Sequence, residues 1–86
     1  MKINLHIDYA GGVSRDIVAN AADMVAFESK FDVSVAALGQ EPKLSYLFFI
    51  AYACEKRTGN TKETFEKWLE SVDQVGATDA DPKSKG

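Results

Sequence analysis

The sequence is short of cysteine, of histidine and of positive charge, and each shortage excludes a class of function. Cys54 is the only cysteine, so the chain can form neither an internal disulfide nor a thiolate metal site of its own. The net charge is −3 and the pI is near 5.0. Binding to phosphates requires a basic surface, and Lys56 and Arg57 are the only adjacent basic pair, so we expect no nucleic-acid partner.

Long hydrophobic runs are also lacking. The apolar stretch over residues 44–54 is far shorter than the ~20 residues that a helix needs to cross a bilayer. Residues 1–9 alternate apolar and polar side chains and lack the apolar segment of a signal peptide. We therefore expect a soluble cytoplasmic protein with no membrane contact. At 86 residues it forms one small domain, and such domains are often marginally stable alone, which favours self-association or a partner.

Motifs that carry enzymatic chemistry are missing as well. The sequence has no phosphate-binding P-loop, no GxSxG nucleophile turn and no HExxH metal motif. The only histidine, His6, is expected on the solvent face of a strand near Asp16. A His–Asp pair can orient a general base, but a polar surface pair between two strands is the favoured interpretation. We expect no catalytic residues, no cofactor-binding residues, no metal ligands and no enzymatic activity.

The first twenty residues predict a β-hairpin. Apolar side chains recur at every second position and share one face: Ile3, Leu5, Ile7 and Tyr9. A three-residue loop over residues 10–12 keeps that face intact, because it pairs Leu5 with Ile17. It also places His6 opposite Asp16 on the solvent-exposed face of the hairpin. A two-residue turn would mix the two faces, so we predict the longer loop, with a glycine in the left-handed region.

Capping residues predict the first helix. Asn20 is a suitable N-cap for a helix over residues 21–31, and Asp23 can complete a capping box. Residues 32–40 fit either a short turn of helix or an extended connector. The helix is thus predicted from its cap, and the sequence does not decide between the two structures for residues 32–40.

Two further helices are expected. Pro42 suits the first turn of a helix that runs to about Arg57, and Gly59 suits its end. Asn60 or Thr61 would cap the last helix. The apolar side of that helix would hold Phe65, Trp68, Leu69 and Val72.

The fold class predicted from these elements is α+β. We expect a single small domain over residues 1–75, with an N-terminal β-hairpin followed by about three α-helices. From Gly76 on the sequence has no large apolar side chain, which predicts a flexible C-terminal tail over residues 76–86.

The helix over residues 42–57 has two apolar faces, and they carry the main functional question. One face holds Leu44, Leu47, Phe48, Ala51 and Cys54. The other holds Tyr46, Phe49, Ile50, Ala53 and Arg57. A helix that is hydrophobic all round must be buried, so either it is the central helix of the fold or its second face belongs to a partner. Aromatic residues beside an arginine are favoured at interface centres, and we take the second face as the candidate partner-binding surface.

Three segments carry a resemblance to a known family. They are DMVAFESKFDVSVAAL, LSYLFFIAYACEKRTGNT and TFEKWLESVDQV. Together with the N-terminal hairpin they cover about residues 1–76, and they resemble small tail assembly chaperones of long-tailed bacteriophages. The resemblance implies a virus-encoded, non-enzymatic assembly factor in the host cytoplasm. Such a factor binds the tape measure protein, helps recruit tail tube subunits and is absent from the mature virion. In many of these phages a ribosomal frameshift adds a C-terminal domain, for which the tail here would suit as a linker.

Two other interpretations stay open. A structural head–tail connector or neck component would persist in purified virions and form a closed ring. A small bacterial regulatory adaptor or antitoxin-like module would have a host enzyme or toxin as its partner. A homo-oligomer is compatible with each of these interpretations and with the chaperone.

Overall fold

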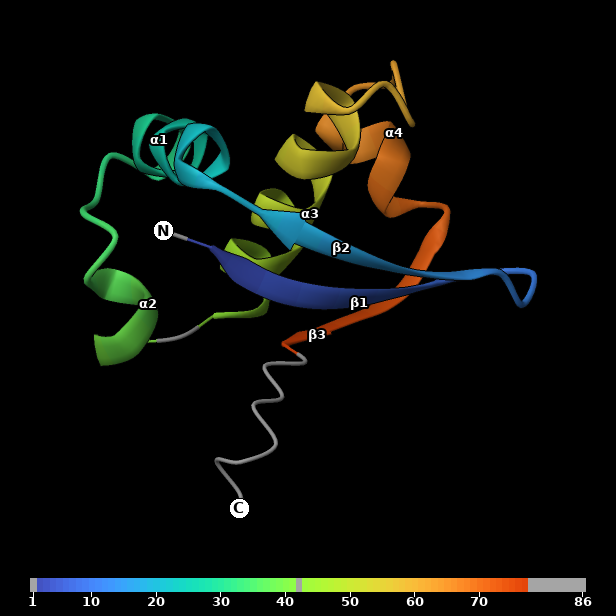
Figure 1. The fold of residues 1–86 in the computed structure, drawn as a ribbon, viewed down its shortest axis with the longest axis horizontal. Coiled ribbons are helices and arrows are strands. Elements are labelled where there is room, and N and C mark those ends of the chain that lie inside the picture. Colours follow the sequence, from blue (N-terminus) through green and yellow to red (C-terminus); the bar gives the residue numbers. More distant parts are fainter. Residues whose placement is uncertain (1, 42, 78–86) are drawn as a thin grey trace.

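A three-stranded antiparallel sheet and the helices packed on it form the fold, in a computed structural model that describes residues 2–41 and 43–77 (Figure 1). The strand order is β2-β1-β3. The elements along the chain are β1 Ile3–Tyr9, β2 Ser14–Ala19, α1 Ala21–Phe31, α2 Ala37–Gln40, α3 Leu44–Arg57, α4 Phe65–Leu69 and β3 Val72–Ala77. The predicted α+β class with an N-terminal hairpin is confirmed. None of the helices in the described ranges is long and apolar enough to cross a membrane.

The hairpin has the predicted register. Leu5 pairs with Ile17, and His6 pairs with Asp16. The loop over residues 10–12 is closed by the backbone N–H of Tyr9, which donates to the Val13 carbonyl at 2.7 Å. Both loop glycines have positive φ angles of about 100°, a conformation that side chains with a Cβ rarely adopt. Strict alternation predicted this register because a slip of one residue would expose the whole apolar face.

The third strand, β3, was not expected. Val72 was predicted as part of the last helix, and residues 76–77 as the start of the tail; both predictions are wrong. β3 pairs with β1 on the side opposite β2, with Val75 beside Ile7. This pairing uses backbone groups of β1 that the hairpin leaves free, and it buries Val75 to 3% exposure. The rest of the predicted tail, residues 78–86, lies outside the described residues.

The helices follow their caps. The capping box of α1 is confirmed: the Asn20 side chain accepts from the Ala22 N–H at 3.0 Å, and the Asp23 carboxylate accepts from the Asn20 N–H at 2.9 Å. The open segment over residues 32–40 contains the short helix α2. The expected start at Pro42 lies outside the described residues, and α3 begins at Leu44.

The last helix begins later than predicted. Thr64 caps α4, and its hydroxyl accepts from the Lys67 N–H at 3.2 Å. Asn60, the predicted cap, instead turns back to α3, where its side-chain amide donates to the Glu55 carboxylate at 2.8 Å. The turn after α3 therefore belongs to the end of that helix, and α4 is only five residues long.

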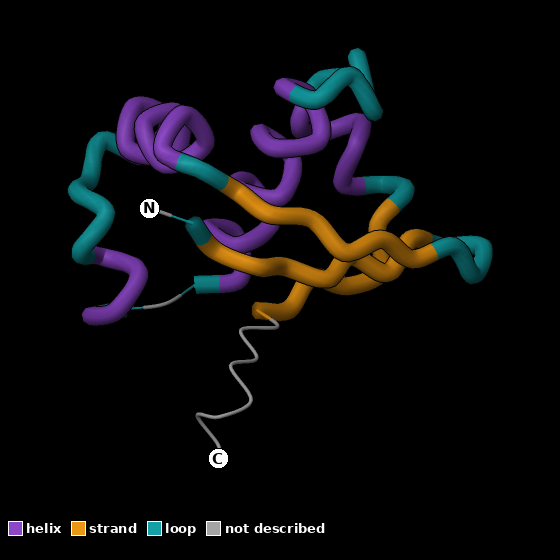
Figure 2. Tube along the Cα trace, viewed as in Figure 1, coloured by secondary structure: helices purple, strands orange, loops and turns teal. Residues whose placement is uncertain are grey.

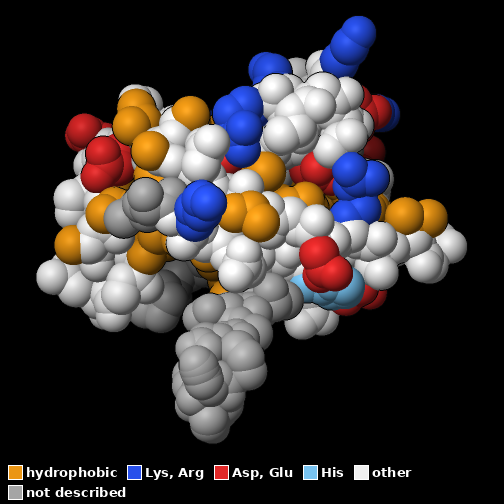
Figure 3. Space-filling view, viewed as in Figure 1, with side chains coloured by type: hydrophobic (Ala, Val, Ile, Leu, Met, Phe, Trp, Pro, Cys, Tyr) orange, Lys and Arg blue, Asp and Glu red, His pale blue; other side chains and the backbone are white. Residues whose placement is uncertain are grey.

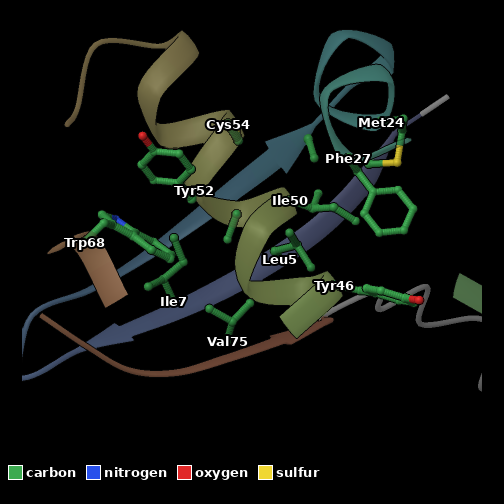
Figure 4. Close-up of a cluster of buried hydrophobic side chains, with 12 residues drawn as sticks. Leu5, Ile7, Met24, Phe27, Tyr46, Ile50, Tyr52, Cys54, Trp68 and Val75 are labelled. Carbon is green, nitrogen blue, oxygen red and sulfur yellow. The ribbon is translucent and has the colours of Figure 1, made fainter. Parts of the chain in front are cut away.

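The core lies between the sheet and α3 (Figures 2 and 4). Leu5 and Ile7 of β1 face Ile50 and Ala51 of α3, and all four side chains have 0% exposure. α1 closes one end of this layer with Met24 and Phe27, and α4 closes the other with Trp68 (Figure 4). The opposite face of the sheet is polar except for Val18, which is 47% exposed. In Figure 3 the pale blue histidine lies beside acidic side chains on this face.

Candidate functional site

α3 is covered on nearly all sides, which settles how its two apolar faces are used. Ile50 and Ala51 are fully buried, and Cys54 retains 2% exposure. The sheet, α1 and α4 pack around the helix. Solvent reaches its two ends, at residues 44–45 and 56–57, and its partly buried residues 47–49. Of the two alternatives drawn from the sequence, the central helix is the one the fold adopts.

The predicted partner surface is therefore divided by the fold. Tyr46 and Ile50 are not on the surface: Tyr46 is 7% exposed and packs edge-on against Phe27 of α1, with ring centroids 5.0 Å apart. The prediction that these two side chains face a partner is wrong, because α1 and the sheet cover them. Phe49 is half-buried, Ala53 keeps 8% exposure and Arg57 is exposed. The partner role of these three residues stays a prediction.

The opposite apolar face is less buried than expected. Leu44, assigned to the core side, is 68% exposed, and Leu47 and Phe48 are only partly buried. Leu44 is the first residue of α3, so no preceding turn of the helix covers it. The deepest part of α3 lies between the two predicted faces and towards its C-terminal half.

A shallow groove runs between α1 and α3, and its lining includes the accessible Phe49 and Arg57 together with the buried Ala53. We call it the α1/α3 groove; its volume is about 420 Å³. It is lined by Ala22, Asp23 and Ala26 of α1 and by Phe49, Tyr52, Ala53, Lys56 and Arg57 of α3. The short side chains of Ala22, Ala26 and Ala53 leave room between the helices, and the rings of Phe49 and Tyr52, 5.8 Å apart, supply an aromatic wall.

An ion pair closes one end of this groove. The Arg57 guanidinium donates twice to the Asp23 carboxylate, through Nε and Nη2, at 3.0 Å each. Asp23 is 2% exposed and also caps α1, so one carboxylate joins the first turn of α1 to the last turn of α3. The helix dipole favours both charges, because Asp23 lies at the N-terminus of α1 and Arg57 at the C-terminus of α3. The hydrogen bond to Asp23 raises the pKa of Arg57.

Two lysines lie over the aromatic wall. The Lys30 ammonium is 6.0 Å from the ring centre of Phe49 and 5.8 Å from that of Phe65. The Lys56 ammonium is 5.8 Å from the ring centre of Tyr52. Such cation–ring contacts hold the ammonium above the apolar surface. Within the described part of the chain, no carboxylate lies in ion-pair distance of either lysine.

The aromatic wall is one section of a continuous row. Its rings are in successive edge or tilted contact from α1 to β1, in the order Phe31, Phe49, Phe65, Tyr52, Trp68 and Tyr9. Phe31, Phe49 and Phe65 are half-buried, so the row reaches the surface at the groove. Contacting rings restrict one another, which makes this wall a preformed surface.

A buried carboxylate, Glu55 of α3, binds side chains from β1, from β2 and from the turn after α3. Glu55 is 1% exposed, and its Oε2 accepts from the Tyr9 hydroxyl at 2.7 Å and forms an ion pair with Arg15 Nε at 3.0 Å. Its Oε1 accepts from the Asn60 side-chain amide at 2.8 Å. The Trp68 indole N–H donates to the Tyr9 hydroxyl at 3.2 Å, which completes the Glu55 cluster. Burial and then the hydrogen bond to Glu55 raise the pKa of Tyr9 to about 12.

The Glu55 cluster was not predicted, although the sequence carries a signal for it. Glu55 follows Phe48 and Ala51 at spacings of seven and four, on a face otherwise apolar. A charged side chain at such a position requires buried partners. A hollow of about 330 Å³ adjoins the cluster, but every acceptor contact of Glu55 is with a donor of the chain itself. These contacts join α3 to β1, to β2 and to the turn after α3.

His6 and Asp16, the polar pair weighed for catalysis, lie apart from the α1/α3 groove and from the Glu55 cluster. His6 Nδ1 is 2.6 Å from Asp16 and Nε2 is 3.0 Å from Asp8, on the open face of the sheet. The hydrogen bond to Asp16 raises the pKa of His6. Burial raises the pKa of the Cys54 thiol, which donates to the Val18 carbonyl at 3.4 Å, so it acts as a small apolar side chain. Among the residues described, no three His, Cys, Asp or Glu side chains are grouped to hold a metal ion.

Comparison with known proteins identifies no relative. No family model, no curated protein and no solved structure matches the chain. The function is therefore inferred from the residues and the geometry above.

Proposed function

We propose that this chain is a phage tail assembly chaperone that binds the tape measure protein and helps recruit tail tube subunits. Two things support the proposal. The sequence over about residues 1–76 resembles that family, and the α1/α3 groove offers an accessible apolar surface between two helices. The groove is the observation that carries the binding role, because most of the other apolar side chains of α3 are buried inside the domain.

The chemistry of the groove suits a helical client. A helix that exposes an apolar stripe can lie in a groove between two helices and bury that stripe there. The alanine side chains at the base of the groove allow close approach, and the ring of Phe49 gives a preformed contact. Charged side chains around the groove keep the chaperone itself soluble while the apolar surface is free. The proposal entails action in the host cytoplasm and absence from the mature virion.

The test is capture of the client from cells that produce the whole phage. The tagged chain is recovered by affinity, and retained proteins are identified by mass spectrometry. We expect a very long, helix-rich phage protein. Ala26→Trp fills the groove and should abolish that capture. Val25→Trp makes the same change one residue away at a 60% exposed position and should not.

Other outcomes contradict the proposal. Recovery of portal or neck proteins, or of this chain in purified virions, would assign it to the structural class. Equal capture by both tryptophan variants would show that the α1/α3 groove is not the client-binding surface.

A further inference from the structure

The charge around the α1/α3 groove is opposite to the charge of the whole chain. The sequence has 13 acidic and 10 basic residues. Around the groove and its aromatic wall lie Lys30, Lys56 and Arg57, and the one acidic residue that lines the groove is Asp23. Asp23 is buried and already bonded twice to Arg57. The two lysines therefore leave a positive potential beside an apolar surface.

The position of these lysines determines which side chains of a bound helix they would attract or repel. Lys30 belongs to α1 and lies over Phe49, while Lys56 belongs to α3 and lies over Tyr52, so each helix contributes one ammonium beside the aromatic wall. A helix whose apolar stripe fills the groove would bring the residues that flank the stripe beside these ammonium groups. Lysine or arginine at those flanking positions would be repelled, and aspartate or glutamate would be attracted.

We infer that the α1/α3 groove binds an amphipathic helix of a partner protein whose apolar stripe is flanked by aspartate or glutamate. The inference rests on the proposed function in one respect, since it takes the client-binding groove as its site. Charge complementarity selects this partner over a helix with basic flanks. Exposed ion pairs add little affinity, so the charges act mainly on selectivity and on the rate of association.

The experiment uses the full chain and two labelled synthetic helices with the same apolar stripe, one flanked by Glu and the other by Lys. Fluorescence anisotropy gives both dissociation constants. We expect the Glu-flanked helix to bind at least tenfold more tightly at low salt. The preference should shrink at about 1 M salt, where the screening length falls to about 3 Å.

Charge variants of the chain locate the effect. The double variant Lys30→Glu/Lys56→Glu should reverse the preference, whereas Lys67→Glu, an exposed lysine on α4, should leave it unchanged. Circular dichroism of each variant establishes that it is folded. Equal binding of the two helices, or a preference that survives in the double variant, would overturn the inference.

Two further outcomes separate this inference from the proposed function. If light scattering shows a dimer that the double variant dissociates, the occupant is a second copy and the inference is wrong. If the tape measure protein is captured equally by the double variant, the inference fails and the proposed function stands. If the Glu-flanked helix binds selectively but no tape measure protein is captured, the proposed function fails and the inference stands.

Discussion

Removal of the Glu55 carboxylate should destabilise the domain more than any surface change. Glu55→Ala deletes an acceptor with 1% exposure and leaves Tyr9, Arg15 and Asn60 without their shared partner. A hydrogen bond to a charged group contributes about 1.5–3 kcal/mol, and two of these donors are neutral groups bonded to a buried carboxylate. Arg15 is 41% exposed, so water replaces most of its contact and its share is about 0–1 kcal/mol.

The expected loss in the free energy of unfolding is about 3–6 kcal/mol, from about 1.5–3 kcal/mol for each of the two hydrogen bonds to the buried carboxylate. A domain of this size has a total stability of about 5–15 kcal/mol, so the variant should remain folded at low temperature. Glu55→Gln keeps the volume and one acceptor oxygen but points an amide N–H at a donor. It should cost about 1–3 kcal/mol.

Urea unfolding followed by fluorescence measures these losses directly. Trp68 is the only tryptophan, is 1% exposed and donates to Tyr9 within the cluster, so its emission reports on this part of the fold. Glu70→Ala, at a 73% exposed side chain, is the matched control and should change stability by less than about 0.5 kcal/mol. In a double-mutant cycle, Tyr9→Phe and Glu55→Gln should not be additive. A loss below about 1 kcal/mol for Glu55→Ala would refute the argument.

The same physical reasoning gives three further predictions. Ile50→Ala should cost about 2–5 kcal/mol in urea unfolding, while Leu44→Ala, at a 68% exposed side chain, should cost less than about 0.5 kcal/mol; the reverse order would show that the other face of α3 is the core. NMR titration should place the pKa of His6 above 6.5, and Asp16→Asn should lower it. Because the folded state raises this pKa, the stabilisation is fully present below pH 6.5 and is lost as the pH rises through the folded-state value. Cys54 should react with a thiol reagent only as fast as the domain opens, and rapid modification of the folded protein would contradict its burial.

Features set by neighbours in the sequence were predictable. The hairpin register follows from alternation over a few residues, and a one-residue slip would expose its whole apolar face. The capping box of α1 involves Asn20 and Asp23, three residues apart, so its geometry is local. In both places the residues that determine the structure lie within one element and its turn.

Features set by distant partners were not predictable. β3 was missed because its stability comes from pairing with β1, and Val75 gains its burial only beside Ile7. The start of α4 was misplaced because Asn60 bonds to Glu55 instead of capping the next helix. A sequence pattern records the apolar or polar character of a residue, and it does not record which distant group will meet it.

The sequence by itself determined that the helix over Leu44–Arg57 is apolar on all sides and that nearly all of its surface must be covered. Only the tertiary structure decided what covers it. α1 and the sheet pack against Tyr46 and Ile50, and Trp68 of α4 packs against Tyr52, so most of the predicted partner face is buried within the domain. What remains accessible on that face is the groove beside Phe49, because the alanine side chains of α1 are too short to fill it.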